Sequence, residues 1–157
     1  MAITKNGERV QIGQLELTFI VSGEECGGHV DVFELMVPPG ARVPIPHFHT
    51  EIDEVVVGLE GVLTYRVGDT THEVRPGDRV FSPRGVEHHF QNLHDTPARA
   101  LSILTPGKTG IGYFRDVAAV INAGGPPDMA KLAGVMKRYG LVPSPPKAPP
   151  AVTAGTR

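Results

Sequence analysis

The sequence predicts an all-β domain of short strands, with two short helices near its C-terminal end. Three observations favour this fold class. The chain of 157 residues contains 19 Gly and 15 Pro, which implies many turns. Short apolar segments rich in β-branched residues recur between these turns over the first two thirds of the chain. Apolar spacing becomes helical only after Pro106, so we expect a β sandwich or barrel with two helices packed on it.

The first strands are marked by their composition. Residues 15–22 are rich in Leu, Thr, Phe, Ile and Val, and residues 29–37 form a similar apolar segment. Residues 42–49 look extended but contain Pro44 and Pro46. Because proline cannot donate a hydrogen bond to a sheet, we expect this segment at an edge or rim.

The segment 52–59 differs from its neighbours because it is almost entirely apolar. A strand with one solvated face alternates, so both faces of this strand are expected to be covered. A partner subunit or a C-terminal element would cover the outer face. Together with the apolar first strand, this predicts a homodimer. Turn signals such as Gly68-Asp69 separate the later strands, which we expect at residues 62–67, 70–74, 79–82, 86–92 and 98–104.

Two helices are expected after the last of these strands. One has apolar residues at helical spacing over residues 117–121, and the other has an apolar stripe over residues 132–139. Asp128 suits the start of the second helix and Gly140 its end. The chain is therefore expected to divide into a barrel (1–107), a helical segment packed on it (108–142) and an extended Pro-rich tail (143–157).

Composition also narrows the expected partners and location. The formal net charge is −2 and the basic residues form no cluster, which argues against a nucleic-acid partner. The single cysteine, Cys26, excludes an intramolecular disulfide framework and fits a reducing compartment, so we expect a cytoplasmic protein. The N-terminus lacks the apolar segment of a signal peptide, and no apolar run approaches the roughly 18 residues of a membrane-spanning helix. No membrane partner is expected.

The strongest chemical signal lies in residues 47–54. A strand directs His47 and His49 to the same face, and a bend after them returns Glu54 within reach. Two imidazoles and a carboxylate on one surface suit a divalent transition metal. Glu51 and Asp53 could compete with Glu54 as ligands, although we expect them to be solvated or to hold a histidine N–H.

A further ligand is expected from the pair His88 and His89. Neighbouring residues of a strand face opposite ways, so only one of the two can point inward. Phe90 lies on the same side as His88, which favours His88. The remaining histidines have no motif around them and are expected at the surface or around the site: His29, His72, His89 and His94.

These residues resemble the two motifs of the cupin superfamily. The sequence matches the second motif, G-x5-P-x-G-x2-H-x3-N, in full. It matches the first motif, G-x5-H-x-H-x3-4-E-x6-G, except at Gly40: six residues, rather than five, lie between this glycine and the first histidine. The resemblance implies a double-stranded β-helix, the cupin form of the jelly roll. It also implies the metal ligands His47, His49, Glu54 and His88.

The expected pocket suggests the chemistry. Its inward wall is predicted to include Tyr65, Phe81 or Val80, Phe90 and Ile103. An apolar wall with one phenol suits an aromatic or weakly polar substrate better than a phosphorylated sugar, which needs several basic side chains.

The resemblance extends to bacterial quercetin-dioxygenase-like cupins, which implies a dioxygenase acting on an aromatic or enolisable small molecule. In that reading Glu54 acts as a base as well as a ligand. The metal stays open among Fe, Mn, Ni, Co, Zn and Cu. Two alternatives also stay open: a non-redox metal-dependent isomerase or hydrolase, and a non-catalytic cupin that binds a small ligand.

Overall fold

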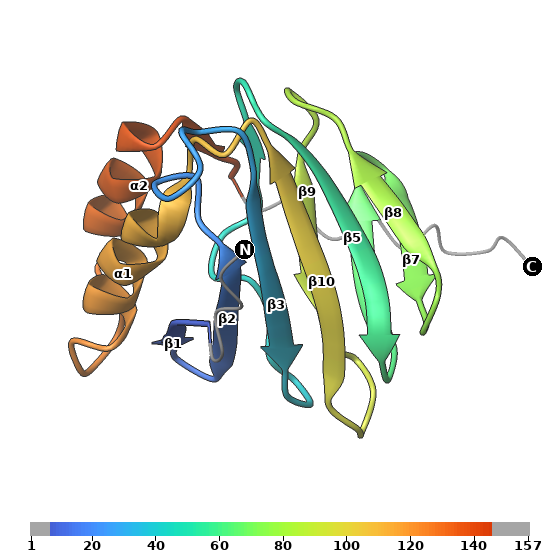
Figure 1. Cartoon of the computed structure of the whole chain (residues 1–157). Helices are drawn as coiled ribbons and strands as arrows, with labels where there is room; N and C mark the ends of the chain where they lie inside the picture. The colour runs from blue at the N-terminus through green and yellow to red at the C-terminus, as the bar shows by residue number, and fades with distance from the viewer. Residues whose placement is uncertain (1–6, 146–157) are drawn as a thin grey trace, which may run out of the picture.

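Two antiparallel β-sheets face each other, and a pair of helices lies at one side of them (Figure 1). This computed structural model describes residues 7–145. Its elements, in chain order, are β1 (Arg9–Ile12), β2 (Leu15–Val21), β3 (Asp31–Val37), β4 (His47–His49), β5 (Asp53–Glu60), β6 (Leu63–Val67), β7 (Thr70–Val74), β8 (Arg79–Ser82), β9 (His88–Gln91), β10 (Ala98–Thr105), α1 (Gly110–Ile121), α2 (Met129–Arg138) and β11 (Leu141–Pro143).

The strand order confirms the predicted fold class. One sheet has six strands in the order β1-β2-β3-β10-β5-β8, and the other has five in the order β11-β4-β9-β6-β7. Strands distant in the chain, such as β3 and β10, become neighbours, so the chain winds back and forth between the two sheets. This is the arrangement of a double-stranded β-helix, with the core between the sheets.

Alternating burial selects the inner face of each strand. In β5, Glu54 and Val56 are buried between the sheets, whereas Val55 and Val57 are half-buried on the outside. Within residues 7–145, the helices pack elsewhere: α1 lies beside β1 (Figure 1), and α2 packs against β11. Neither described helix therefore covers the outer face of this strand, and cover by a partner subunit stays a prediction.

Two strands were not predicted. β1 forms a hairpin with β2, and β11 pairs with β4 at the edge of the five-stranded sheet. Both are edge strands of only three or four residues, so their sequences carry a weak strand signal. The segment expected to start the tail at residue 143 instead ends β11, and the backbone N–H of Ser144 donates to the carbonyl of Pro46 at 2.9 Å. The rest of the predicted tail, residues 146–157, lies outside the described residues.

Both helices have defined starts. Asp128 caps α2, because its side chain accepts a hydrogen bond from the backbone N–H of Lys131 at 3.0 Å. The start of α1 is held differently. The buried carboxylate of Asp31 accepts one bond from the N–H of Gly110 at 3.0 Å and another from the N–H of Gly23 at 2.6 Å. One carboxylate thus joins β3, the loop after β2 and α1.

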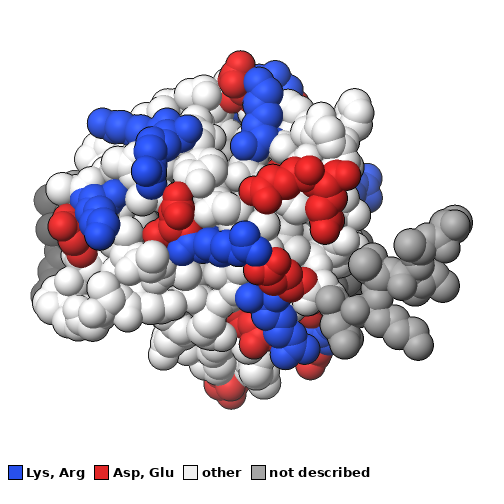
Figure 2. Space-filling model, turned by 60° about the vertical axis from the view of Figure 1, so that its left-hand side comes forward, with Lys and Arg blue, Asp and Glu red and all other residues white. Residues whose placement is uncertain are grey.

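Charges are mixed over the surface on the helix side of the molecule. Figure 2 shows acidic and basic side chains interspersed on this face. Several form ion pairs, including Arg115 of α1 with Glu8 and Arg138 of α2 with Asp116. Neither helix of the described part is long and apolar enough to cross a membrane.

Candidate metal centre

Three histidines meet between the sheets on two neighbouring strands. His47 and His49 lie on β4, and His88 lies on β9 directly opposite His47. All three side chains are buried. The turn before β9 fixes this approach, because Gly85 adopts a φ of 78° and donates its N–H to the carbonyl of His49 at 2.8 Å. The glycine of the second motif therefore ties one histidine strand to the other.

The three imidazoles are close enough to share one cation. Each offers a nitrogen, and these nitrogens lie within 4.8 Å of one another. Nδ1 of His47 is held by the carbonyl of Ile45 at 2.8 Å, which leaves its Nε2 as the free lone pair. Nδ1 of His49 is buried without a hydrogen-bond partner among the described residues. The other ring nitrogen of His49, Nε2, is the one that faces Glu54.

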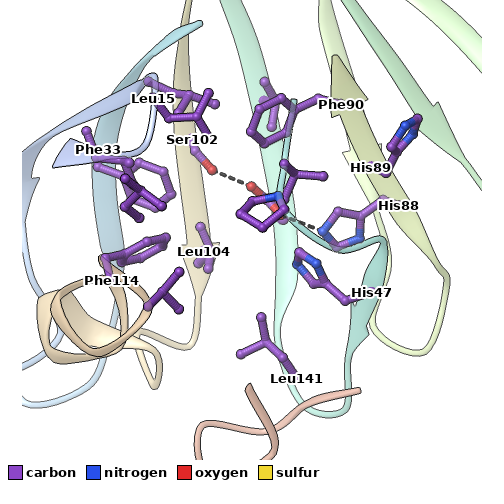
Figure 3. Close-up of a pocket in the computed structure, with 18 of the residues that line it drawn as sticks. Leu15, Phe33, His47, His88, His89, Phe90, Ser102, Leu104, Phe114 and Leu141 are labelled. Carbon is purple, nitrogen blue, oxygen red and sulfur yellow. Dashed lines mark hydrogen bonds and ion pairs between the residues drawn. The ribbon is translucent and has the colours of Figure 1, made fainter. Parts of the chain in front are cut away.

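Glu54 approaches the three imidazoles from β5, in the other sheet. Its Oε2 lies 3.1 Å from Nε2 of His88 and 3.7 Å from Nε2 of His49. Its other oxygen, Oε1, accepts a short hydrogen bond from Oγ of Ser102 on β10 (Figure 3). The structure thus brings together all four residues that the sequence analysis named as ligands, and adds a serine that it did not name.

The electrostatics keep two of these groups in the forms that bind a metal. Burial, reinforced by the neighbouring His88 and His49, lowers the pKa of His47 from 6.5 to about 3. Its imidazole is therefore neutral at physiological pH. Burial alone would raise the pKa of Glu54, but hydrogen bonds from His49 and His88 hold this pKa well below 4.5. A neutral imidazole and an ionised carboxylate are the ligand forms that a divalent metal requires.

The acidic alternatives to Glu54 are engaged elsewhere. Asp53 forms an ion pair with Arg84 at 2.7 Å, and Glu51 forms one with Lys108 at 2.9 Å. The pKa of Asp53 falls to about 2 because the side chain and backbone of Arg84 donate hydrogen bonds to it. Neither carboxylate reaches the three imidazoles, which leaves Glu54 as the acidic member of the cluster.

The surplus histidines also lie apart from the cluster. His94 pairs with Glu73 at 2.7 Å on the surface. Figure 3 shows His89 directed away from the imidazoles of His47 and His88. As the alternation of strand side chains predicted, His88 points inward and its neighbour His89 does not.

A small cavity adjoins the imidazoles, with a volume of about 80 Å³. Tyr65 and Phe90 line it, as the sequence predicted. Two predicted wall residues do not. Phe81 is 55% exposed, and Ile103 lies on the outer face of β10.

Strand register explains both errors. Phe81 and Ile103 each pair with Val55, an outward residue of β5, so both share its face. Neighbouring residues of a strand point to opposite faces of the sheet. Ser102 and Leu104, on either side of Ile103, therefore point inward and line the cavity. Val80, the stated alternative to Phe81, is buried inside but is not part of the cavity wall.

The cavity wall is mostly apolar and draws on both sheets, on α1 and on the segment that precedes β4. No Lys or Arg belongs to it within the described part of the chain. The polar groups of the wall are those of the metal cluster, Ser102, His89 and two tyrosines. The wall residues are Ile12, Leu15, Leu17, Phe33, Leu35, Val43, Pro44, His47, His49, Glu54, Val56, Tyr65, His88, His89, Phe90, Ala100, Ser102, Leu104, Tyr113, Phe114, Val117 and Leu141.

The part of the chain that carries the three histidines and Glu54 also matches a known protein family. Residues 33–104, which carry all four clustered side chains, match the family model of the cupin domain. This chain contains a cupin domain. The resemblance to the cupin superfamily seen in its two motifs is confirmed, and the strand order is that of the same fold.

The cupin domain has curated relatives in plants and bacteria. It is similar to germin-like protein subfamily 1 member 1 of Arabidopsis thaliana, with 38% identity over 69 residues that cover 41% of this chain and 31% of that protein. It is also similar to protein SchB of Streptomyces halstedii, with 32% identity over 71 residues that cover 45% of this chain and 51% of that protein. The chain thus spans between about a third and a half of these relatives.

Solved structures of other cupins resemble it as well. A sugar phosphate isomerase of the cupin superfamily from Silicibacter pomeroyi is 30% identical, with a TM-score of 0.53 over 60% of each chain. A predicted oxalate decarboxylase from Thermotoga maritima is 22% identical, with a TM-score of 0.57 over 63% of this cupin and 90% of that chain. The second likeness is one of fold alone.

Proposed function

We propose that this cupin is a metal-dependent enzyme, and specifically a dioxygenase that acts on a small enolisable compound. The observation that carries the proposal is the cluster of three imidazoles and Glu54 at the wall of an apolar cavity. Four protein ligands leave one or two positions of a five- or six-coordinate ion open, and open positions distinguish catalytic sites from structural ones. A bound Fe, Mn, Ni, Co, Zn or Cu ion would supply a Lewis acid and a site for an oxygen ligand.

Glu54 has a second role in this proposal, as the base. An enolisable compound loses a proton before it reacts with dioxygen, and Oε2 of Glu54 is the carboxylate oxygen turned toward the imidazoles. Ser102 occupies the other oxygen, so the proton-accepting atom keeps one orientation. The apolar wall excludes water, which strengthens electrostatic interactions inside the cavity.

The overall reaction balances without an added reductant. Both atoms of dioxygen enter the organic substrate, and a carbon–carbon bond of that substrate is broken and oxidised. The substrate itself therefore supplies the electrons that reduce dioxygen.

The size of the cavity narrows the substrate class. Its volume of about 80 Å³ is roughly half of the 150 Å³ cavity that holds benzene in another protein. A compound of a few heavy atoms fits, whereas a flavonol would require the wall to move. Of the aromatic and enolisable compounds considered as substrates, the cavity volume therefore favours the small enolisable ones.

A non-redox isomerase is the second candidate, because the isomerase from Silicibacter pomeroyi is 30% identical to this cupin. Its named substrate class fits the cavity poorly, since a phosphorylated sugar calls for basic side chains and none belongs to the described wall. Metal-assisted isomerisation or hydrolysis of an uncharged small compound remains compatible with the same ligands.

Oxygen dependence separates the candidates. Protein purified without an affinity tag is analysed for metal, and oxygen uptake is then measured with short diketones, hydroxyketones and a flavonol. We expect uptake with small enolisable compounds, stoichiometric with substrate loss and abolished by metal removal. A Glu54→Gln variant should lose turnover, and His94→Ala, which changes a surface histidine, should not.

Conversion that continues under anaerobic conditions would establish the isomerase or hydrolase. Tight binding of a compound without any turnover would establish a binding protein.

A further inference from the structure

The cavity wall contains a second phenol that the sequence analysis did not name. Tyr113 lies on α1, is only 7% exposed, and lines the cavity beside its neighbour Phe114. Its ring packs against Phe114, with centroids 4.8 Å apart, and against Tyr139, with centroids 5.3 Å apart. These contacts fix the ring of Tyr113 within the wall.

The hydroxyl of Tyr113 differs from those of the other two tyrosines. Tyr65 accepts a hydrogen bond from Oγ of Ser82 at 3.4 Å, and Tyr139 donates one to Asp116 at 2.9 Å. No described residue forms a hydrogen bond with the hydroxyl of Tyr113. An O–H that no protein group holds is available to donate, and a bound acceptor in the cavity would gain that interaction.

The charge of Glu54, beside the three imidazoles, affects the pKa of the same hydroxyl. Burial and, after it, the negative charge of Glu54 raise the pKa of Tyr113 above its usual value of 10. The phenol therefore keeps its proton at physiological pH. It can act there as a hydrogen-bond donor but not as an anion.

We infer that Tyr113 determines specificity by donating a hydrogen bond to a second acceptor atom of the compound that occupies the open side of the metal site. The inference rests on the proposed metal site. Tyr113 would then favour compounds with two acceptor atoms: one to contact the metal, and one within reach of its own hydroxyl. An apolar molecule with a single oxygen would leave the hydroxyl unpaired and bind more weakly.

Binding of azide to the Co(II)-loaded protein tests this inference, because azide is a small anion with acceptor atoms at both ends. Azide is titrated into the parent, into Tyr113→Phe and into Tyr139→Phe, and visible absorption of the metal reports binding. Tyr113→Phe keeps the ring and its packing, so its Co(II) affinity and thermal midpoint should match those of the parent. Its azide dissociation constant should rise about five- to tenfold, as for the loss of one hydrogen bond. Tyr139→Phe should bind azide like the parent.

The possible failures are distinguishable. An azide affinity unchanged in Tyr113→Phe, or a parent that binds Co(II) but not azide, would overturn the role of Tyr113 and leave the metal site standing. Equal weakening in both variants would also overturn it, since the effect would then come from helix packing. Failure of the parent to bind Co(II) would instead remove the metal site and this inference together.

Discussion

Ser102 determines how Glu54, the proposed acidic ligand, is oriented. Its hydroxyl holds Oε1 of Glu54, which leaves Oε2 for the side of the imidazoles. Groups that orient metal ligands in this way typically contribute 10- to 100-fold to metal affinity. Ser82 provides a matched comparison, because it is also buried and lies opposite Glu54 on β8, but its hydroxyl bonds Tyr65.

Replacing Ser102 with Ala should therefore weaken metal binding by about tenfold or more. The change leaves a buried carboxylate oxygen without its donor, while the strand itself keeps its packing. Competition with a chromophoric chelator measures the dissociation constant. Ser82→Ala should remain within about threefold of the parent, on the scale of a single weak hydrogen bond. Equal losses in the two variants would show that Ser102 has no specific role.

The buried phenols predict how stability responds to alkali. Burial, then the charge of Glu54, raises the pKa of both Tyr65 and Tyr113 above 10 in the folded protein. Below pH 10 the folded and unfolded states both keep these protons. Above it the unfolded chain releases them first, so the free energy of unfolding should fall as the pH rises.

An alkaline titration of the folded protein measures this effect directly. Tyrosinate absorbance should stay low beyond pH 10 and then rise together with loss of structure. Ordinary tyrosine titration around pH 10, with the circular dichroism unchanged, would show that the two phenols are accessible and the cavity open.

At the scale of elements, the clearest dependence is that of α1 on β3. Asp31 accepts from the N–H groups of Gly23 and Gly110, and the hydroxyl of Ser22 accepts from the N–H of Ile111. These contacts anchor the start of the helix that carries Tyr113 and Phe114. A carboxylate at a helix N-terminus also interacts favourably with the helix dipole.

Asp31→Asn should destabilise the fold by about 2 kcal/mol, because one accepting oxygen becomes an N–H donor that faces a backbone N–H. The urea midpoint of unfolding should fall while the denaturant slope stays constant. Asp95→Asn, at an exposed position in the loop before β10, is the control and should leave the midpoint unchanged. A midpoint for Asp31→Asn equal to that of the control would remove Asp31 as the anchor of α1.

How far the sequence predicts each element depends on the strength of its local pattern. The two motifs predict that three histidines meet and that Glu54 lies beside them, because fixed spacings and turn glycines such as Gly85 determine that geometry. Ser102 and Tyr113 were missed, since their roles depend on contacts with distant parts of the chain. Phe81 was misassigned by one residue of strand parity, which an isolated four-residue strand does not determine.

At the scale of the whole molecule, the misassigned residues support the expected homodimer. Val32, Ile103, Val55 and Phe81 lie in register across four adjacent strands on the outer face of the six-stranded sheet. On the same face, Arg99 pairs with acidic residues of β3 and β5. An apolar centre with charges of both signs at its edge can pair with a second copy of itself.

The homodimer therefore remains a prediction, with Phe81 as its centre. Light scattering should give twice the chain mass for the parent, and Phe81→Glu should give the monomer mass. Leu93→Glu, at a 67% exposed apolar residue in the loop between β9 and β10, should remain dimeric. A monomeric parent at micromolar concentration would contradict the prediction.

The metal centre itself is tested most directly by titrating tag-free, metal-depleted protein with Co(II) or Zn(II). The account predicts one ion per chain for the parent and for His94→Ala. It predicts a loss of affinity above about 100-fold for His88→Ala, since removing a ligand costs more than removing a group that supports one. Unsaturable binding by the parent, or parent-like affinity in His88→Ala, would contradict the assignment of these side chains to a metal.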